Sequence, residues 1–463
     1  MGEKMQVTIG SAIRVEDPTE ELKRWCVDNL VMLNPEYAKK KRMNFWLGNT
    51  PQVLHLYEKH GDTLILPFGI LTKITELLNG ADIYTDFMNK SYINYNCDVP
   101  LYDYQSAAVE EMLTHHNGIL KAPAGSGKTQ MGIAMISMLK GRALWLTHTK
   151  DLLTQSMERA KQYMSSDLIG TITEGKINLG EGVTFATIQT MSKLDLTQYK
   201  YYWDVIIVDE CHRVTGTPTA ITQFYKVLNN LAARYKFGLS ATVHRADQTI
   251  QATYALLGEV AYAVPDEAVE KTVMKVGIKT VYTKTKLSPE CLNTDGTLNY
   301  TKLISYLCSN TDRNKTIIEA IKKEQEKPSL ILSDRISQLK ILINMMPKKL
   351  QDKAIIITGK DKKEYRDKAL EDMRTGKKLY LFATYSLAKE GLDIPCLERL
   401  FMATPVKDYA VVTQAIGRIA RTCEGKTAAV NYDFVDDVRY LANAYVKRCG
   451  IYRKNGCHFM EER

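Results

Sequence analysis

Short apolar runs alternate with stretches of helical spacing over most of the chain. One series of apolar runs lies at residues 118–120, 143–147, 183–188, 205–208 and 237–239, and a second lies at 330–332, 354–357, 379–383, 399–403 and 428–432. Runs of this length are typical of buried strands. Strands that alternate with helices predict parallel sheets with helices on both faces. We therefore expect two α/β lobes.

The first hundred residues do not share this alternation. Residues 7–15 have an extended pattern, and residues 18–30 combine a helix-start signature with helical spacing. The apolar runs at 53–57 and 63–66 flank residues 60–62 (His-Gly-Asp), which predict the turn of a hairpin between them. Mixed signals of this kind favour a small α+β accessory domain.

Length supports a division into several parts, because 463 residues are too many for a single hydrophobic core. Residues 261–272 carry no strong period and are the best candidate for a junction between lobes. We expect an accessory domain at 1–98, a first lobe at 99–265 and a second lobe at 266–463.

Net charge and cysteine content say little about which partner or metal the protein binds. The net charge of +9 is compatible with a polyanionic partner, but lysine-rich surfaces explain it equally well. The nine cysteines form no Cys-x-x-Cys pair, and Cys449, Cys457 and His458 match no tetrahedral metal spacing. No apolar run is long enough for a membrane span, and the first twenty residues lack a signal-peptide core, so we expect a cytoplasmic protein without membrane contact.

The strongest chemical signal is the glycine-bearing segment at 121–129 (Lys-Ala-Pro-Ala-Gly-Ser-Gly-Lys-Thr), between a predicted strand and a predicted helix. Such a loop points backbone N–H groups at phosphate oxygens, while its lysine reaches the β- and γ-phosphates and its hydroxyl can hold Mg²⁺. The strict pattern begins with glycine, where this chain has Ala122. The segment predicts a nucleoside triphosphate site formed by Ala124, Gly125, Ser126, Gly127, Lys128 and Thr129.

A second signal is the carboxylate pair after the apolar strand at 205–208. Asp209 and Glu210 should lie at the carboxyl edge of the sheet, where the phosphate loop is also expected. There Asp209 suits Mg²⁺ bound against the phosphates, and Glu210 suits orienting or deprotonating the attacking water. Both are therefore predicted catalytic residues.

The order of the motifs resembles the superfamily 2 helicases, in the Asp-Glu-x-His form of the DEAD/DEAH-like proteins. Residues 209–212 (Asp-Glu-Cys-His) are similar to their second motif and 240–242 (Ser-Ala-Thr) to their third. Residues 384–395 resemble the fifth motif, and 414–421 (Gln-Ala-Ile-Gly-Arg-Ile-Ala-Arg) match the sixth. The resemblance implies two tandem RecA-like lobes that bind ATP and Mg²⁺.

The sixth motif also has a physical interpretation of its own. Arg418 and Arg421 are three residues apart, so we expect them on one face of a helix. A guanidinium aimed at the γ-phosphate stabilises the transition state of phosphoryl transfer by roughly 10³–10⁵ in rate. If both arginines meet the phosphate loop across a cleft, hydrolysis requires the two lobes to close. Alternate closing and opening would then advance a nucleic-acid strand.

The resemblance assigns further residues to roles. It implies adenine recognition by Gln105, nucleotide contacts by Gly391 and Asp393, and coupling between sites by Ser240, Thr242 and Gln414. It places nucleic-acid contacts at Thr147, His148, Thr187, Thr190 and Thr384. Hydroxyls and backbone amides bind phosphate oxygens without reading sequence, so the motor should track the backbone.

A basic cluster in the accessory domain is a separate candidate for nucleic-acid contact. Lys39, Lys40, Lys41 and Arg42 precede Phe45 and Trp46. Basic residues beside aromatics can bind a phosphate backbone and stack bases. A solvated helix face beside two core aromatics is an equally good interpretation.

These features together predict an ATP-dependent DNA helicase or translocase that acts on duplex or branched DNA. DNA is favoured because residues 238–242, with Arg245 and Asp247, resemble duplex-DNA translocases related to restriction motor subunits, repair helicases and phage branch-migration helicases. Three alternatives stay open: an RNA helicase, the motor subunit of a restriction complex with its nuclease on another chain, and a nucleotide-gated clamp that does not unwind.

Overall fold

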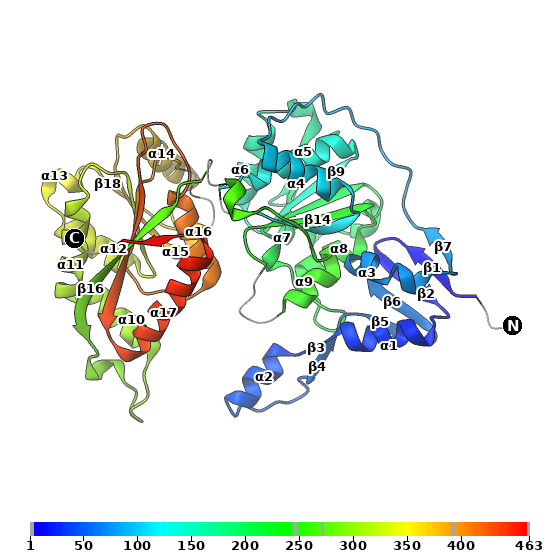
Figure 1. The fold of residues 1–463 in the computed structure, drawn as a ribbon, viewed down its shortest axis with the longest axis horizontal. Helices are drawn as coiled ribbons and strands as arrows, with labels where there is room; N and C mark the ends of the chain where they lie inside the picture. Colours follow the sequence, from blue (N-terminus) through cyan, green and yellow to red (C-terminus); the bar gives the residue numbers. More distant parts are fainter. Residues whose placement is uncertain are drawn as a thin grey trace. The chain divides into compact units, whose positions relative to one another are not determined.

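The structure is a computed structural model that describes residues 4–460 except 124, 244–248, 270–272, 390–391 and 393. It divides into two compact units, the first covering most of residues 1–265 and the second residues 266–463 (Figure 1). Each unit is described by itself. Among the described residues, no helix combines the length and apolar character needed to cross a membrane.

A five-stranded sheet forms the accessory part, in the order β5-β6-β2-β1-β7. Helix α1 follows β2 and is capped by the Thr19 side chain, as the helix-start signature predicts. The elements are β1 (Gln6–Ile9), β2 (Ala12–Glu16), α1 (Glu20–Asn29), β3 (Val31–Leu33), α2 (Pro35–Arg42), β4 (Val53–His55), β5 (Glu58–His60), β6 (Thr63–Pro67), η1 (Phe68–Ile70), α3 (Leu71–Ile74), η2 (Glu76–Leu78) and β7 (Asp82–Thr85).

The predicted hairpin is only partly correct. The turn at 60–62 does join two antiparallel strands, β5 and β6. Residues 53–55, however, pair with β3 in a separate two-stranded ribbon. The reason is that the backbone of Leu56 bonds to Leu30, which ties this segment to the end of α1 and leaves only the three residues of β5 to pair with β6. The ribbon carries α2.

The first α/β lobe has an eight-stranded sheet in the order β11-β10-β12-β9-β13-β14-β8-β15. All five predicted strands are present, and every pairing is parallel except β10 with β11. The elements are α4 (Asp103–Leu113), β8 (Asn117–Lys121), α5 (Lys128–Leu139), β9 (Ala143–Thr147), α6 (Lys150–Ala160), η3 (Ser166–Leu168), β10 (Ile169–Thr173), β11 (Lys176–Asn178), β12 (Val183–Thr187), α7 (Ile188–Met191), η4 (Leu196–Tyr199), β13 (Val205–Asp209), η5 (Cys211–Arg213), α8 (Gln223–Asn230), β14 (Tyr235–Ser240), α9 (Ile250–Leu257) and β15 (Val260–Ala263).

Three strands of this sheet, β10, β11 and β15, have no clear signal in the sequence. β15 lies at the edge of the sheet and is half-exposed or exposed throughout, so it lacks a buried apolar run. β11 is fully exposed, and β10 mixes threonines with its two isoleucines. An exposed edge strand, or an inner strand that is rich in threonine, therefore lacks the continuous apolar run that marks the other strands of this sheet.

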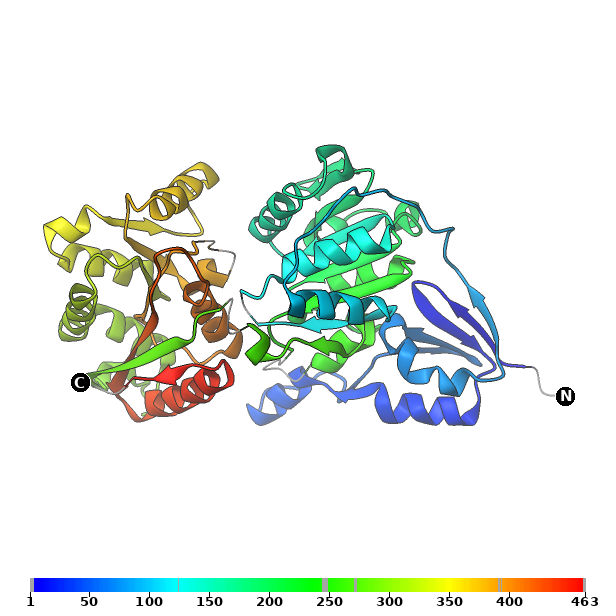
Figure 2. The same ribbon diagram turned by 45° about the horizontal axis from the view of Figure 1, so that its top comes forward.

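The second lobe has a seven-stranded, fully parallel sheet in the order β18-β19-β17-β20-β21-β16-β22. Helices cover both of its faces, as the strand–helix alternation predicts (Figure 2). A core cluster of buried side chains lies on each face. The elements are η6 (Asp266–Val269), β16 (Val276–Lys286), η7 (Pro289–Cys291), α10 (Tyr300–Ser309), α11 (Thr311–Lys323), β17 (Ser329–Ser333), α12 (Ile336–Met345), α13 (Lys348–Gln351), β18 (Ala354–Ile357), α14 (Lys363–Arg374), β19 (Tyr380–Thr384), α15 (Tyr385–Lys389), β20 (Arg399–Met402), α16 (Tyr409–Ile419), β21 (Ala429–Asp437), α17 (Arg439–Lys454) and β22 (His458–Phe459).

The accessory sheet packs against α9 of the first lobe. Ala252 and Ala255 belong to the same apolar cluster as the core of the accessory part. Gly69 lies so close to α9 that a Cβ placed there would be 2.4 Å from the Tyr254 carbonyl oxygen. Asn117 donates from Nδ2 to the Gly69 carbonyl at 2.8 Å. These contacts join the two parts into one unit.

A buried lysine adds a further link between them. Lys236 of β14 is 1% exposed, and its Nζ donates to the carbonyls of Leu228 at 2.7 Å and Ser11 at 2.9 Å. The ammonium also lies over the Phe68 ring. Burial lowers the pKa of Lys236 to about 7, because an apolar surrounding disfavours the charged form.

This lysine should make stability depend on pH. Between pH 7 and about 10.5 the unfolded chain binds more protons at Lys236 than the folded chain, so the free energy of unfolding rises with pH. One proton corresponds to about 1.4 kcal/mol per pH unit. Lys236→Met should remove this slope, whereas the exposed Lys161→Met should keep it. Urea unfolding at several pH values tests this, and equal slopes in both variants would contradict it.

Candidate nucleotide site and nucleic-acid contacts

The glycine-bearing loop joins β8 to α5 as predicted. Gly125 and Gly127 have φ angles of +88° and +81°, a region that residues with a Cβ rarely adopt. Gly127 is the N-cap, so α5 begins at Lys128. The ammonium of Lys128 donates to the carbonyls of Ala122 at 3.3 Å and Pro123 at 3.4 Å, which places it inside the loop. Ala124 lies outside the described residues.

Gln105 lies beside this loop. It is 2% exposed, and its Oε1 accepts a hydrogen bond from the backbone N–H of Tyr102 at 2.9 Å. A Cβ at Gly127 would be 2.4 Å from Gln105 Nε2, so a larger residue there would have to displace the Gln105 side chain, while the φ of +81° already favours glycine. The start of α4 is thereby held against the start of α5. This position suits the proposed contact with adenine.

Asp209 ends β13 as a buried carboxylate. It accepts from the Glu210 N–H at 2.9 Å and from the Ser156 hydroxyl at 3.4 Å. Burial, reinforced by the charge of Glu210, raises the pKa of Asp209 well above its usual value, and the Lys128 charge opposes the shift. Lys128 and Asp209 therefore share one electrostatic environment. A divalent cation would compensate this buried carboxylate, so the residues fit Mg²⁺ held by Asp209 and Thr129.

Glu210 connects to the third motif through His212. Glu210 has a left-handed backbone, with φ 50° and ψ 49°, and its carboxylate lies 3.2 Å from His212 Nδ1. The same His212 nitrogen lies 3.1 Å from the Ser240 hydroxyl. Ser240 bonds in turn to the backbone of Thr242, and its carbonyl accepts from the Ala122 N–H at 3.0 Å. Ser240 therefore contacts both the carboxylate motif and the phosphate loop.

The candidate nucleic-acid contacts of the first lobe lie on the same sheet edge. Thr147 and Thr187 end neighbouring strands and are register partners. Thr147 is fully buried and its hydroxyl donates to the Thr149 carbonyl at 3.0 Å, so its side chain is not available to a ligand in this structure. The hydroxyls of Thr187 and Thr190 bond to each other at 3.0 Å.

His148 follows Thr147 at this edge of the sheet. Its Nδ1 is buried and has no hydrogen-bond partner among the described residues. Burial and the nearby Arg213 charge lower the pKa of His148 to about 4, so the ring is neutral at physiological pH. The Gln189 side chain donates to its carbonyl at 2.7 Å. Glu210 and His212 also act on this pKa, so His148 lies near the carboxylate motif.

The second lobe contradicts one geometric prediction. Helix α16 ends at Ile419, so Arg421 does not lie on a helical face with Arg418. Instead Arg421 forms a bridge with Val273. The Lys426 ammonium donates to the carbonyls of Ile419 and Arg421, both at 2.6 Å, which satisfies carbonyls left open where the helix stops.

Arg418 has a structural contact that the sequence did not predict. Its guanidinium donates to the carbonyls of Ala388 at 3.1 Å and Leu392 at 3.2 Å, and so it holds the segment of the fifth motif. Gln414 lies one turn earlier on α16, with its Oε1 buried. Thr384 ends β19 and bonds to the Ser386 hydroxyl. Gly391 and Asp393 lie outside the described residues, as do Arg245 and Asp247 of the first lobe.

The basic cluster of the accessory part lies on a projecting ribbon, in helix α2, which has no buried residue (Figure 1). Lys40 bonds to Glu36 and Thr50, whereas Lys39, Lys41 and Arg42 are at the surface. Phe45 is 57% exposed and Trp46 is 88% exposed. The interpretation of these two aromatics as core residues is therefore wrong.

Several residues of the site were missed in the sequence. Ser156 of α6 carries no local signal, because its contact with Asp209 depends on how the helix packs. Ser333, Asp334 and Arg335 follow an apolar strand in the same way as Asp209 and Glu210, and that signal could have been used. No group of three or more His, Cys, Asp or Glu suited to a metal occurs in the part of the chain that the structure describes.

Comparison with known proteins agrees with this geometry. Residues 98–245 match the family "Type III restriction enzyme, res subunit", and residues 312–423 match "Helicase conserved C-terminal domain". Among solved structures, the protein is similar to S. cerevisiae Dbp5 bound to RNA and ADP BeF3. The alignment covers 85% of this chain and 94% of that chain, with 18% sequence identity and a TM-score of 0.54. That likeness supports the two-lobe fold.

Curated relatives include viral and archaeal proteins. The putative ATP-dependent RNA helicase L396 of Acanthamoeba polyphaga mimivirus is 24% identical over 69% of this chain and 60% of its own length. The ATP-dependent DNA helicase uvsW of Enterobacteria phage T4 is 25% identical over 72% and 68%. The DNA 3'-5' translocase XPB2 of Sulfurisphaera tokodaii is 27% identical over 70% and 79%. The chain spans about three fifths of the length of the first curated relatives it matches.

Proposed function

We propose that this chain, which belongs to superfamily 2 of the helicases, couples ATP hydrolysis to movement along DNA. The observation that carries the proposal is the set of contacts around Ser240. This residue contacts His212 through its hydroxyl and Ala122 through its carbonyl, so it adjoins both the carboxylates and the phosphate loop. A change at the γ-phosphate can thus reach the third motif directly.

The phosphate site has the groups that hydrolysis needs. Backbone N–H groups of the loop and the Lys128 ammonium bind the phosphates, and Thr129 and Asp209 hold Mg²⁺, which neutralises phosphate charge when bound. Glu210 orients and deprotonates the attacking water, while His212 fixes the position of its carboxylate. Adenine binds at Gln105.

The second lobe completes the cycle in this proposal. Arg418 and Arg421 stabilise charge on the γ-phosphate when the lobes close, and Gln414 links that event to the strand path. Arg418 donates hydrogen bonds to the carbonyls of Ala388 and Leu392. Movement of Arg418 would therefore also shift the fifth motif. The three-part division at 1–98, 99–265 and 266–463 belongs to the same proposal.

DNA is the proposed track. Two relatives carry DNA activities in their names, and the run at 238–242 resembles duplex-DNA translocases. An RNA helicase is the second candidate, because the mimivirus relative is named as one. The two other candidates, a restriction motor and a nucleotide-gated clamp that does not unwind, would use the same ATP site, so that site does not distinguish them from a translocase.

One experiment separates these candidates. ATP turnover should be measured with no nucleic acid, single-stranded DNA, duplex DNA, a four-way junction and RNA, at one salt concentration. We expect the largest stimulation with duplex or branched DNA. Stimulation by RNA alone would favour the RNA helicase, and DNA stimulation without strand displacement or translocation would favour the clamp. No stimulation by any of them would contradict the proposed function.

The exposed ribbon provides a further prediction. Replacing Lys39, Lys41 and Arg42 with Gln should weaken DNA binding and flatten its salt dependence, because fewer counterions are released. Up to three phosphate contacts would be lost, so the slope of log K against log salt should fall by up to about 2.7. Fluorescence anisotropy with labelled duplex at several salt concentrations measures the slope.

A matched variant controls for net charge. Lys348, Lys349 and Lys377 are exposed lysines that precede β18 or β19, at the amino edge of the second sheet. Their replacement by Gln removes the same charge and should leave the slope close to that of the wild type. Equal slopes in both triple variants would show that the ribbon is a solvated surface.

A further inference from the structure

Neighbouring strands of the second sheet end in a row of polar and aromatic residues. The order β19-β17-β20-β21 brings together the ends of these four strands and the segments that follow them. They carry Thr384, Arg335, Lys407 and Tyr440 in that order. Ligands of parallel α/β sheets bind at this carboxyl edge. Of the four, only Thr384 has been assigned a contact above.

The loop after β20 is fixed by buried groups on several sides. Its first residue, Ala403, accepts at the carbonyl from Arg313 Nη1 at 2.6 Å. The Tyr385 hydroxyl donates to the Thr404 carbonyl at 2.8 Å, and Arg448 Nη1 donates to the Val406 carbonyl at 2.9 Å. Three anchored carbonyls within four residues leave the loop little freedom, so the residue that follows them is held in a defined position.

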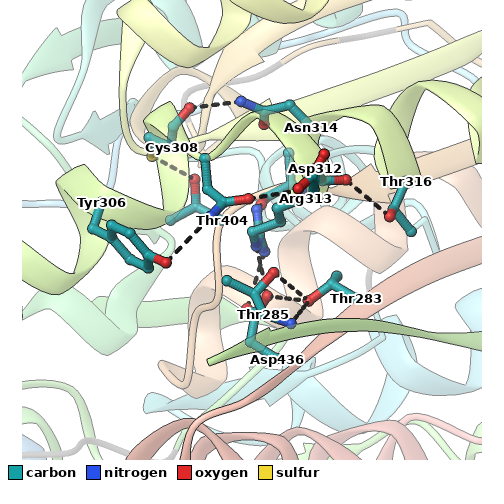
Figure 3. A network of polar contacts seen from close by, with 12 residues as sticks. Thr283, Thr285, Tyr306, Cys308, Asp312, Arg313, Asn314, Thr316, Thr404 and Asp436 are labelled. Carbon is teal, nitrogen blue, oxygen red and sulfur yellow. Dashed lines mark hydrogen bonds and ion pairs between the residues drawn. The ribbon is translucent and has the colours of Figure 1, made fainter. Parts of the chain in front are cut away.

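Arg313 is itself held by a buried ion pair (Figure 3). Its Nε donates to Asp436 Oδ1 at 2.7 Å, and both side chains are fully buried. Asp436 also accepts from the Thr283 hydroxyl at 2.6 Å. This network connects the start of α11 to the carboxyl ends of β16, β20 and β21. It gives the row of strand ends a rigid base.

Lys407 follows the anchored loop and contacts two tyrosines. Its Nζ donates to the Tyr440 hydroxyl at 2.8 Å and lies 5.1 Å from the centre of the Tyr440 ring and 6.0 Å from that of Tyr300. The two rings are 5.8 Å apart with planes inclined by 58°. Tyr300 is 42% exposed and Tyr440 is 39% exposed. An aromatic pair with an adjacent cation is therefore open to solvent.

The local electrostatics favour an anion. Helices α12 and α17 begin at this edge, and neither has a side-chain hydrogen bond at its N-cap. Their N-terminal N–H groups add partial positive charge to that of Lys407. Two carboxylates lie nearby. Asp408 caps α16 by accepting from the Val411 N–H. Burial and the Asp334 charge raise the pKa of Tyr300, and the Arg335 guanidinium opposes this shift, so the negative charge of Asp334 is accompanied by a positive one.

We propose that Tyr300, Tyr440 and Lys407 form a binding site for one nucleotide of the nucleic-acid strand. The base stacks on an exposed tyrosine face, and its phosphate is bound by Lys407 and the N-terminus of α17. Stacking on aromatic rings tolerates any base, so the site suits a motor that tracks a strand without reading its sequence. The inference rests on the proposed function, because it requires a nucleic-acid track.

The test uses the full chain and oligonucleotides that contain 2-aminopurine, whose fluorescence falls when the base stacks. Tyr440→Ala should weaken single-stranded DNA binding by about 5- to 150-fold, the range measured for loss of one stacked base, and should reduce the fluorescence change. Tyr440→Phe should keep both. Lys407→Gln should weaken binding while the fluorescence change at saturation remains.

Controls separate this site from general damage. Tyr365→Ala removes another exposed tyrosine of the same lobe, on α14, and should bind as the wild type does. ATP turnover without nucleic acid should also be unchanged in Tyr365→Ala.

Two outcomes would overturn the inference in different ways. If the wild type binds DNA and Tyr440→Ala and Tyr300→Ala bind equally well, the tyrosines are surface packing and the proposed function stands. If the wild type neither binds nor is stimulated by any nucleic acid, the proposed function fails and the inference fails with it.

Discussion

Lys128→Ala is expected to reduce ATP turnover by roughly 10²–10³-fold or more, the range seen when a positioned group that stabilises transition-state charge is removed. The Lys128 ammonium already lies inside the loop, against the carbonyls of Ala122 and Pro123. In the proposed site, the ammonium exchanges these carbonyls for phosphate oxygens. Loss of the side chain therefore removes a full positive charge that lies beside the reacting phosphate. Steady-state release of phosphate, with and without DNA, measures the effect.

The control for this variant is Lys161→Ala, which removes an exposed lysine that pairs with Glu158 three residues away. It should keep wild-type turnover. Thermal unfolding should show that Lys128→Ala remains folded, because the side chain is only partly buried and makes long hydrogen bonds. Retention of most turnover by a folded Lys128→Ala would remove the assignment of the phosphate loop.

Glu210→Gln should abolish hydrolysis but preserve ATP binding. The amide has the shape of the carboxylate and cannot accept a proton, so loss of general-base catalysis should cost about 10²–10⁴-fold in turnover. ATP would then stay bound in its unhydrolysed form, and binding to nucleic acid in the presence of ATP should become tighter and longer-lived. Single-turnover hydrolysis and the DNA dissociation rate, each measured with ATP, give the two halves of this prediction.

The contact between Glu210 and His212 sharpens that test. His212→Ala removes the group 3.2 Å from the carboxylate and also the contact with Ser240, but leaves the base itself in place. It should lower turnover less than Glu210→Gln does and weaken the effect of ATP on DNA binding. Glu174→Gln, on an exposed ion pair with Lys150, is the neutral control. Unchanged hydrolysis in Glu210→Gln would refute its role as the base.

Local patterns in the sequence were enough for the main architecture. The strand at 143–147 has the same bounds in the structure as in the prediction, because a strand buried on both faces is almost entirely apolar. The edge strand at 354–357 also has the predicted bounds, although it is mostly half-exposed. The phosphate loop was equally clear, since positive φ angles at Gly125 and Gly127 require glycine. The roles assigned to the site residues stay predictions.

Other features depended on contacts between distant parts of the chain. The spacing of Arg418 and Arg421 suggested one helical face, but α16 ends at Ile419, between them, and the distant Lys426 binds the carbonyls of Ile419 and Arg421. The apolar run at 53–57 was paired with the wrong strand, because the bond between Leu56 and Leu30 is invisible to a local pattern.

What the sequence by itself determined is most of the strands of the two lobes, the phosphate loop and the carboxylate pair, since each follows from constraints within a few residues. Only the tertiary structure decided which groups meet: Ser240 with His212, Lys236 with Ser11, and Lys407 with its two tyrosines. The physical reason is that burial and backbone conformation act locally along the chain. Hydrogen bonds and ring contacts between side chains depend instead on how whole elements pack.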